Sequence, residues 1–318
     1  MSNFYTWPGT AFPFRLYVNT PACRIFIIHN LTHNYDWLKE VKEKIKPTDF
    51  FFVTIAWYLD EHLLKQANEM FKELNLNPAQ FFIMYNDIEE QINGFNHGLD
   101  GEIINHNAWL DENIFYIEEG VEKTYDALYI ARRSEMKRHH LCESIENLAL
   151  VAGGANHKNK ICEIPECKNN PSEILDASGV RKIINQSKTG LCLSQKEGAC
   201  WSSGEYLLCG TPVVSTQNFG GRSTFYNLNN SLISDDNKIS VAQAVDNLIK
   251  KNFNPEDIRK DHIRKQTYFR KIFKKNLYYV LKSRGVELNV DEYFKDNFID
   301  KMYHGVTFES VIDFFKNA

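Results

Sequence analysis

The sequence is poor in the cysteine patterns that define disulfide-bonded or zinc-binding proteins. It has seven cysteines, an odd number, and no C-x-x-C pair. Most of them lie in apolar runs such as TGLCLS and EYLLCG, which is typical of buried thiols in a reducing cytoplasm. Cys162 and Cys167 together with His157 fit no standard zinc spacing. We therefore expect neither a disulfide framework nor a bound metal.

Long apolar runs and a strong charge of one sign are also absent. No run approaches the ~20 residues of a transmembrane helix. The N-terminal stretch MSNFYTWPGTAFPFRL has no basic region followed by a long apolar core, so we expect no signal peptide. The net charge of -4 over 318 residues gives no overall nucleic-acid footprint. We expect a cytoplasmic chain, either soluble or attached to a membrane surface.

Motifs of two common enzyme classes are missing as well. Neither CRIFIIHN nor LALVAGGANHK carries the G-x-G-x-x-G turn of a dinucleotide-binding oxidoreductase. The second class is that of metal-dependent enzymes with an Asp-x-Asp motif. No such motif follows a predicted strand, and Asp235-Asp236 lies in a polar loop that is typical of a turn. We therefore expect no cofactor.

Short apolar runs alternate with amphipathic stretches along the first half of the chain. Continuously apolar strands that alternate with helices indicate a parallel sheet covered on both faces. The polar segment 87–108 is predicted to be a loop at the carboxyl edge of this sheet, where open α/β sheets bind ligands. The predicted strands are 23–29, 50–57, 80–85 and 114–117, and the predicted helices are 35–45 and 60–74.

The same rhythm begins again after residue 120, so the sequence predicts an α/β protein with two Rossmann-like domains. We expect residues 1–120 to form the first domain and residues 121–257 to form the second. Residues 258–318 are predicted to be helical and to pack back toward the first domain. The strands predicted in the second domain are 125–132, 148–154, 189–194 and 212–216, the helices are 137–147, 173–187 and 203–209, and 155–172 is a loop.

Residues 258–285 predict a long amphipathic helix. Phe269 and Phe273 fall on one side at helical spacing, and basic residues fall on another. Between residues 259 and 284 the chain has ten Lys or Arg residues and one acid, Asp261. Two interpretations stay open. One is a packed helix with a solvated basic face, and the other is contact with an anionic membrane surface or an acidic acceptor.

The most informative motif is the block EGACWSSGEYLLCGTPVVST. It places seven residues between Glu197 and Glu205 and continues into a predicted helix and strand. Ser202, Ser203 and Gly204 are small residues in the turn predicted before the helix, so its first N–H groups are open to an anion. An ordinary capped helix would use the same residues.

Two further segments carry candidate ligands for a charged substrate. In NFGGR, Gly220 and Gly221 suit a close backbone approach to phosphate or sugar, or a plain turn, and Arg222 adds positive charge. In ARRSEMKR, Arg132 and Lys137 lie at the end of a predicted strand and in the turn that follows it. Their neighbours Arg133 and Arg138 either bind the charged substrate as well or face solvent.

Together these motifs resemble the donor-binding domain of GT-B glycosyltransferases, in the large retaining group with a Glu-(seven residues)-Glu motif. The resemblance covers roughly residues 121–250 and is carried by YDALYIARRSEMKRH, by TGLCLSQKEGACWSSGEYLLCGTPVVST and by NFGGR. The sequence is also similar to bacterial transferases that build surface polysaccharide. The first half matches this group by architecture alone. The resemblance implies two domains that face each other across a cleft, with residues 1–120 as the acceptor-side domain and residues 121–257 as the donor-binding domain.

The resemblance also implies roles for the charged residues. Arg132 and Lys137 would grip the diphosphate of a nucleotide-sugar, Glu197 would bind hydroxyls of the donor sugar, and Glu205 would bind the ribose. The acceptor would attack the face from which the diphosphate departs, with the leaving phosphate oxygen as base, so that the anomeric configuration is retained. The two cations would replace a metal.

The implied partners are the nucleotide-sugar and a glycan or lipid-linked saccharide acceptor, and no nucleic acid. The implied place of action is the cytoplasm, including the inner face of the plasma membrane. Some relatives use a first-domain histidine near the reacting centre, and His106 or His29 could fill that place, although a structural histidine fits either position. A non-catalytic carbohydrate or partner-binding module on the same fold stays open as an alternative.

Overall fold

The computed structural model describes residues 11–152 and 162–317. His157, the end of the strand predicted at 148–154 and residues 155–161 of the loop predicted at 155–172 lie outside these residues. The chain divides into two compact units, Met1–Trp109 with Tyr268–Ala318 (unit 1) and Leu110–Thr267 (unit 2). The sequence predicted divisions at 120/121 and 257/258.

Unit 1 is built on a six-stranded sheet in the order β11-β1-β2-β3-β4-β5. β2 to β5 run parallel, whereas β1 is antiparallel to both β2 and β11. The strands are β1 (Ala11–Asn19), β2 (Arg24–His29), β3 (Phe50–Thr54), β4 (Phe81–Tyr85), β5 (Gly101–Ile103) and β11 (His304–Thr307). The helices are α1 (Tyr35–Val41), α2 (Glu61–Leu74), α3 (Ile88–Asn96), the C-terminal part of α7 (Pro255–Ser283), α8 (Val290–Asn297) and α9 (Phe308–Asn317).

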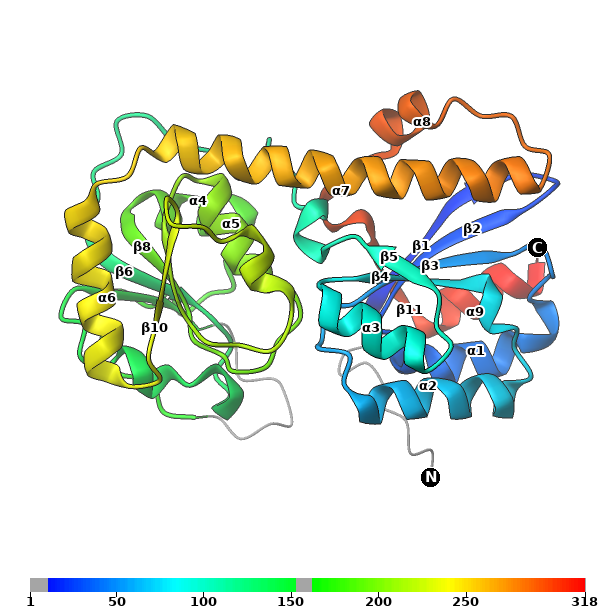
Figure 1. Ribbon diagram of the computed structural model, residues 1–318, viewed down its shortest axis with the longest axis horizontal. Helices are drawn as coiled ribbons and strands as arrows, with labels where there is room; N and C mark the ends of the chain where they lie inside the picture. Colours follow the sequence, from blue (N-terminus) through cyan, green and yellow to red (C-terminus); the bar gives the residue numbers. More distant parts are fainter. Residues whose placement is uncertain (1–10, 153–161, 318) are drawn as a thin grey trace. The chain divides into compact units, whose positions relative to one another are not determined.

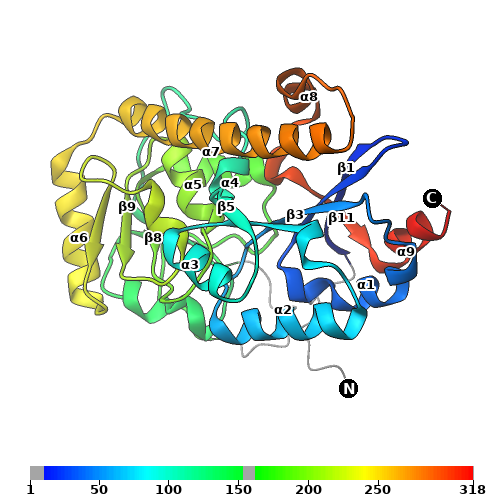
Figure 2. The ribbon, with the colours of Figure 1, turned by 45° about the vertical axis from the view of Figure 1, so that its right-hand side comes forward.

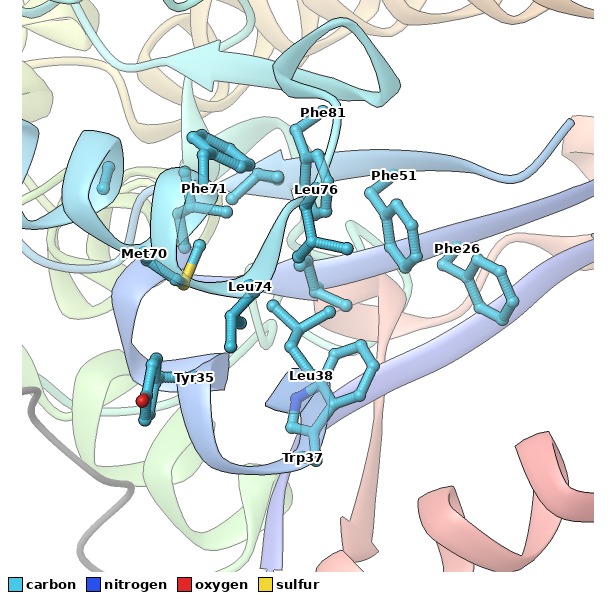
Figure 3. Close-up of a cluster of buried hydrophobic side chains, with 14 of the residues drawn as sticks. Phe26, Tyr35, Trp37, Leu38, Phe51, Met70, Phe71, Leu74, Leu76 and Phe81 are labelled. Carbon is cyan, nitrogen blue, oxygen red and sulfur yellow. The ribbon is translucent and has the colours of Figure 1, made fainter. Parts of the chain in front are cut away.

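Phenylalanines in register join the parallel strands of unit 1. Phe26, Phe51 and Phe81 occupy paired positions on β2, β3 and β4, and their rings stack at centroid distances of 4.9 Å and 4.6 Å (Figure 3). Trp37 and Leu38 of α1 pack beside this row, and both are buried. Aromatic pairs across strands stabilise a sheet beyond the area that they bury, so these rings fix the register on which the carboxyl edge depends.

Helices cover both faces of the unit 1 sheet. Figures 1 and 2 show α1, α2 and α9 on one side and the C-terminal part of α7 on the other. The ring centroid of Phe273 on α7 lies 4.9 Å from that of Phe52. Phe52 points away from the stacked phenylalanines, because alternate residues of a strand face opposite sides of the sheet. Phe273 also contacts Tyr17 and Trp109 at 5.8 Å and 5.1 Å. The helix predicted at 258–285 is confirmed, with its apolar side toward the core.

Unit 2 has a five-stranded parallel sheet in the order β10-β9-β8-β6-β7. Side chains of α6 pack against one face, whereas α4 and α5 lie along the other (Figure 1). The strands are β6 (Tyr125–Ile130), β7 (Leu148–Val151), β8 (Ser187–Cys192), β9 (Val213–Thr216) and β10 (Ser231–Ser234), and the helices are α4 (Ala177–Asn185), α5 (Trp201–Leu208) and α6 (Lys238–Lys251). These two sheets and the C-terminal helices confirm the predicted α/β class.

The prediction of a strand at 114–117 is wrong, because this segment forms no strand in the structure. Its carbonyl groups accept hydrogen bonds from guanidinium groups instead of a neighbouring strand: Arg181 reaches Ile114, and Arg259 reaches Phe115. The fourth parallel strand is β5, which lies within the predicted loop 87–108. It was hidden because it is short and begins at Gly101, where a Cβ would lie 1.9 Å from the carbonyl oxygen of Ile83.

The helix predicted at 137–147 is also wrong. Two short 3-10 turns, Glu135–Lys137 and His139–Cys142, replace it. Arg138 between them has a φ of 51°, a left-handed conformation that an α-helix cannot contain. Of the residues that the structure describes, none belongs to a helix long and apolar enough to cross a membrane.

Candidate active site

Three loops of unit 2 meet where its parallel strands end. One follows β6 and carries Arg132 and Lys137, the second follows β8 and carries Glu197, and the third follows β9 and carries Gly220 and Arg222. Since β6, β8 and β9 are parallel neighbours, their carboxyl ends lie at one edge of the sheet. That edge is where open α/β folds bind ligands.

An ion pair between Lys137 and Glu197 forms the centre of this edge. The Lys137 ammonium donates to Glu197 Oε1 across 60 positions of sequence. The two side chains are 12% and 16% exposed, so each is accessible on one side only. Lys137 is held by its own turn, in which its backbone N–H donates to the carbonyl of Ser134 at 3.0 Å. The structure therefore brings together two of the residues that the sequence selected.

Glu197 is held as a carboxylate in spite of its burial. Burial acts to raise the pKa of this carboxyl, but the charge and hydrogen bond of Lys137, the hydroxyl of Ser194 and the charge of Arg222 outweigh it and lower the pKa to about 2. Ser194 donates to Glu197 Oε2, and Arg222 lies 3.9 Å from the same oxygen. Glu197 is thus ionised throughout the physiological pH range.

Arg222 lies behind Glu197 and is fully buried. Its guanidinium donates to the carbonyl and hydroxyl oxygens of Ser194 at 2.7 Å, to the carbonyl of Thr216 at 3.0 Å and to the hydroxyl of Ser215 at 3.2 Å. These bonds tie the end of β9 to the loop after β8. The sequence selected Arg222 for contact with the donor, which stays a prediction. Its position here is that of a buried support.

Gly220 has a structural reason to be glycine. Its φ is 111°, and a Cβ would lie 1.7 Å from the carbonyl oxygen of Glu197. The two loops are also joined as a short parallel bridge, in which Glu197 N–H donates to the Phe219 carbonyl at 3.1 Å and Phe219 N–H donates to the Gln195 carbonyl at 2.8 Å. The NFGGR segment therefore fixes the backbone of Glu197. A contact of Gly220 or Gly221 with the donor stays a prediction.

Arg138 joins the ends of the strands beneath the ion pair. Its guanidinium donates to the Leu193 carbonyl at 2.6 Å, to the Thr216 hydroxyl at 2.7 Å and to the Asp236 carboxylate at 2.8 Å. The sequence left open whether Arg138 binds the diphosphate or faces solvent. The structure gives it a third role, because directly beside Lys137 it links the loop after β8, the last residue of β9 and the loop after β10.

The other residues of the turn after β6 lie near Lys137 in the chain. Arg132 is partly exposed and its guanidinium reaches the sulfur of Met136, at 3.7 Å, within the same turn. Arg133 donates to the carbonyl of Cys162 at 3.2 Å. Arg132 and Lys137 thus leave the sheet within one short segment, and binding of a diphosphate by both is consistent with this placement.

α5 begins earlier than the sequence predicted. The first helical residue is Trp201 and the N-cap is Cys200, whose φ of 58° turns the chain into the helix. The residues Ser202, Ser203 and Gly204, predicted to form a turn, are therefore part of the first helical turn. All residues of this helix from Ser202 to Leu208 are buried, including its two serines and Glu205.

Glu205 is the second carboxylate of the predicted motif. It lies on α5 and is 6% exposed. Ser203, two residues before it, donates to the hydroxyl of Tyr226 at 2.9 Å. The ribose contact proposed for Glu205 stays a prediction.

His106 and His29 belong to unit 1. Both are 2% exposed, and their rings approach edge to face at 5.3 Å. Burial lowers the pKa of His29 to about 3, and burial together with His29 and Lys301 lowers the pKa of His106 well below its usual value. Both rings are therefore neutral. The catalytic role of His106 stays a prediction.

The described residues offer no obvious metal centre. Across 11–152 and 162–317, no group of three or more His, Cys, Asp and Glu side chains lies close enough together to hold an ion. Ser194 is a supporting residue that the sequence missed, and for Arg138 the sequence missed the supporting role. Ser194 stands three residues before Glu197 at the end of a predicted strand, and this spacing could have indicated it.

Residues 112–266 match the profile of the family Glycosyl transferases group 1. This match covers unit 2 almost from end to end. This similarity covers slightly less than half of the chain, and the fold of the chain is that of the GT-B glycosyltransferases.

Solved structures agree with this fold. The chain is similar to TarM (TM-score 0.56, 14% identity, 80% of this chain and 54% of TarM). It is also similar to Anabaena HepE, crystallised with UDP (TM-score 0.56, 11% identity, 80% of this chain and 78% of HepE). A third is the α,α-trehalose 6-phosphate synthase of Burkholderia multivorans (TM-score 0.55, 10% identity, 84% of this chain and 72% of the synthase). This chain thus spans about half of TarM. A comparison with curated protein sequences found no match.

Proposed function

We propose that this chain is a retaining, metal-independent glycosyltransferase that takes its sugar from a nucleotide-sugar. The observation that carries the proposal is the Lys137–Glu197 ion pair at the carboxyl edge of the unit 2 sheet. Lys137 has three N–H donors and Glu197 uses one of them, so donors remain for an anionic ligand.

The proposed chemistry follows from the charges of this edge. Breaking the bond between sugar and phosphate adds negative charge to the leaving oxygen, and preorganised cations stabilise such charge most where water is excluded. Lys137 and Arg132 are proposed to do this without a metal. The ionised carboxylate of Glu197 is proposed to accept hydrogen bonds from sugar hydroxyls, and Glu205 to accept them from the ribose diol.

Retention is proposed to occur without an enzyme nucleophile. Glu197 is paired with a lysine and a serine, which suits a carboxylate that orients hydroxyls better than one that attacks carbon. The acceptor would then approach from the side of the departing diphosphate, and a phosphate oxygen would take its proton. This mechanism belongs to the Glu-(seven residues)-Glu group that the sequence resembles.

The donor and acceptor classes are proposed from chemistry and from the relatives. The structure of HepE holds UDP, and another similar structure is that of AviGT4, a glycosyltransferase involved in avilamycin A biosynthesis. We propose a nucleotide-sugar donor and a glycan or lipid-linked saccharide acceptor in bacterial surface polysaccharide synthesis. The proposed place of action is the cytoplasm, at the inner face of the plasma membrane.

The test is release of nucleotide from a panel of UDP-, GDP-, ADP-, dTDP- and CMP-activated sugars, in a chelator and with added Mg²⁺ or Mn²⁺. We expect one donor class to be turned over in the chelator. A strict need for added metal would refute the metal-independent part. The anomeric configuration of the sugar product, read by NMR, tests retention.

A non-catalytic binding module would also bind a nucleotide but would release none from any donor. Glu197→Gln is the matched variant, because it keeps the shape of the side chain and removes its charge. We expect this variant to lose about 100-fold in turnover. Equal turnover in both proteins would refute the role of the pair.

A further inference from the structure

The part of α7 that belongs to unit 1 has an exposed face made of lysines and tyrosines. We call it the α7 basic-aromatic face. Residues three, four and seven apart share one side of a helix, and the members of the face follow this spacing. They are Tyr268, Lys271, Lys275, Tyr278, Tyr279 and Lys282.

These aromatic rings are exposed although the helix has a well-buried side. Tyr268, Tyr278 and Tyr279 are 62%, 46% and 56% exposed. Phe273 and Leu277 on the opposite side are fully buried against the sheet. Because the buried side fixes the rotation of the helix, the three tyrosines point outward without contributing to the core. Exposed aromatics gathered on one face indicate a surface for a partner.

The charge of the face has one sign. The sequence contains no Asp or Glu from residue 262 to residue 286. Glu102 lies 3.7 Å from Lys275, whose side chain is still 58% exposed. Asp291 of α8 pairs with Lys274, which lies beside the face. Lys282 lies over the ring of Tyr278 at 5.6 Å. The face therefore keeps a net positive charge.

We propose that the α7 basic-aromatic face binds the surface of an anionic lipid bilayer. Ammonium groups would meet lipid phosphates, and tyrosine rings would lie at the level of the headgroups, where Tyr is enriched in membrane proteins. A single convex helix suits a flat bilayer. The net charge of -4 opposes binding of a long nucleic acid around the whole chain.

This inference rests on the proposed function, because membrane binding would bring the enzyme to its acceptor. A lipid-linked acceptor would lie in the same bilayer surface. Its test does not need a donor or an acceptor, because binding to vesicles is measured without turnover. Failure of vesicle binding would leave glycosyl transfer standing, and failure of glycosyl transfer would leave vesicle binding standing.

The experiment is flotation of the full chain with vesicles of equal parts phosphatidylglycerol and phosphatidylcholine, compared with pure phosphatidylcholine. One variant changes the three lysines of the face to glutamine, and another changes its three tyrosines to serine. Each lysine near an anionic surface contributes about fivefold in binding, so losing three should weaken it roughly 100-fold. Added salt should weaken binding of the unmodified chain.

The matched control changes three exposed lysines to glutamine, namely Lys39 of α1, Lys44 of the short 3-10 helix that follows α1, and Lys72 of α2. Figure 1 shows α1 and α2 on the side of the unit 1 sheet opposite α7. This control removes the same charge and should bind vesicles within severalfold of the unmodified chain. Thermal unfolding midpoints should agree among all variants. Equal weakening by the control, equal binding to pure phosphatidylcholine, or tighter binding to single-stranded DNA than to the vesicles would each overturn the proposal.

Discussion

Replacing Gly220 by alanine tests whether the loop after β9 sets the position of Glu197. The new Cβ would begin 1.7 Å from the carbonyl oxygen of Glu197, whereas ordinary carbon contacts start near ~3.5 Å. The backbones of the two loops must therefore separate by roughly 1.5 Å or more. The bridge between Phe219 and Glu197 cannot survive this movement, because its hydrogen bond is already 3.1 Å long.

The cost has two parts. A side chain at a φ of 111° is strained by about 1–3 kcal/mol, and the lost bridge removes about 1 kcal/mol more. A displacement of about 1 Å at a reacting group lowers turnover by about 100-fold. We therefore expect Gly220→Ala to lower nucleotide release by about 100-fold and to lower the unfolding midpoint of unit 2 modestly.

Gly120→Ala is the matched control. Gly120 also lies in unit 2 and also has a positive φ, of 74°, but among the described residues other than its two chain neighbours no atom lies within 4 Å of the position that its Cβ would take. It carries the conformational cost without the collision, so turnover should stay within severalfold of the unmodified chain. Donor turnover by the released-nucleotide assay, with calorimetric scans of both variants, gives the comparison. Similar turnover in the two variants would show that the contact with Glu197 does not position it.

Three further outcomes follow from the same contacts. Lys137→Met should raise the pKa of Glu197, because burial then acts without the lysine, and should lower nucleotide release by about 100-fold; an unchanged pH profile would count against the pair. Arg138→Lys keeps the charge but cannot form three bonds, so turnover should fall roughly tenfold, whereas full activity would mean that charge alone matters. Burial raises the pKa of Glu90 from 4.5 to about 7. The contribution of this carboxyl to the unfolding free energy is therefore greatest below pH 4.5, and it declines by up to about 3 kcal/mol as pH rises to 7. Glu90→Gln should remove this pH dependence of the unfolding free energy in denaturant titrations.

The architecture could be predicted largely because buried parallel strands leave strong signals. β2, β3 and β4 are continuously apolar, and the sequence located all three. The sequence did not predict β5, because this strand has three residues at the sheet edge and one buried position, and that position is a glycine without an apolar side chain. α3 escaped although Asp87 caps it by accepting from the N–H of Glu90 at 2.9 Å. An Asp followed three residues later by Glu was the available clue.

The candidate site could be predicted as a set of residue types but not as a geometry. Glu197 and Lys137 stood out through their motifs, yet their pairing depends on two loops that meet only when β6 and β8 lie side by side. Arg138 was indistinguishable from a surface arginine, because its three acceptors come from loops as far as 98 positions away. Propensity describes neighbours along the chain, and these contacts are between distant segments.

The charges at this edge form two layers with different tasks. Arg222 and Arg138 donate to backbone and side-chain oxygens of the protein, so they hold the loops in place. Lys137 and Glu197 nearly neutralise each other until a ligand arrives. A bound diphosphate would add negative charge beside Lys137, and the buried arginine behind Glu197 would help to keep that carboxylate ionised in its presence. In the proposed reaction the pair would therefore serve an anionic leaving group and a neutral sugar at once, with Ser194 and Arg222 adding to the effect of Lys137 on the ionisation of Glu197.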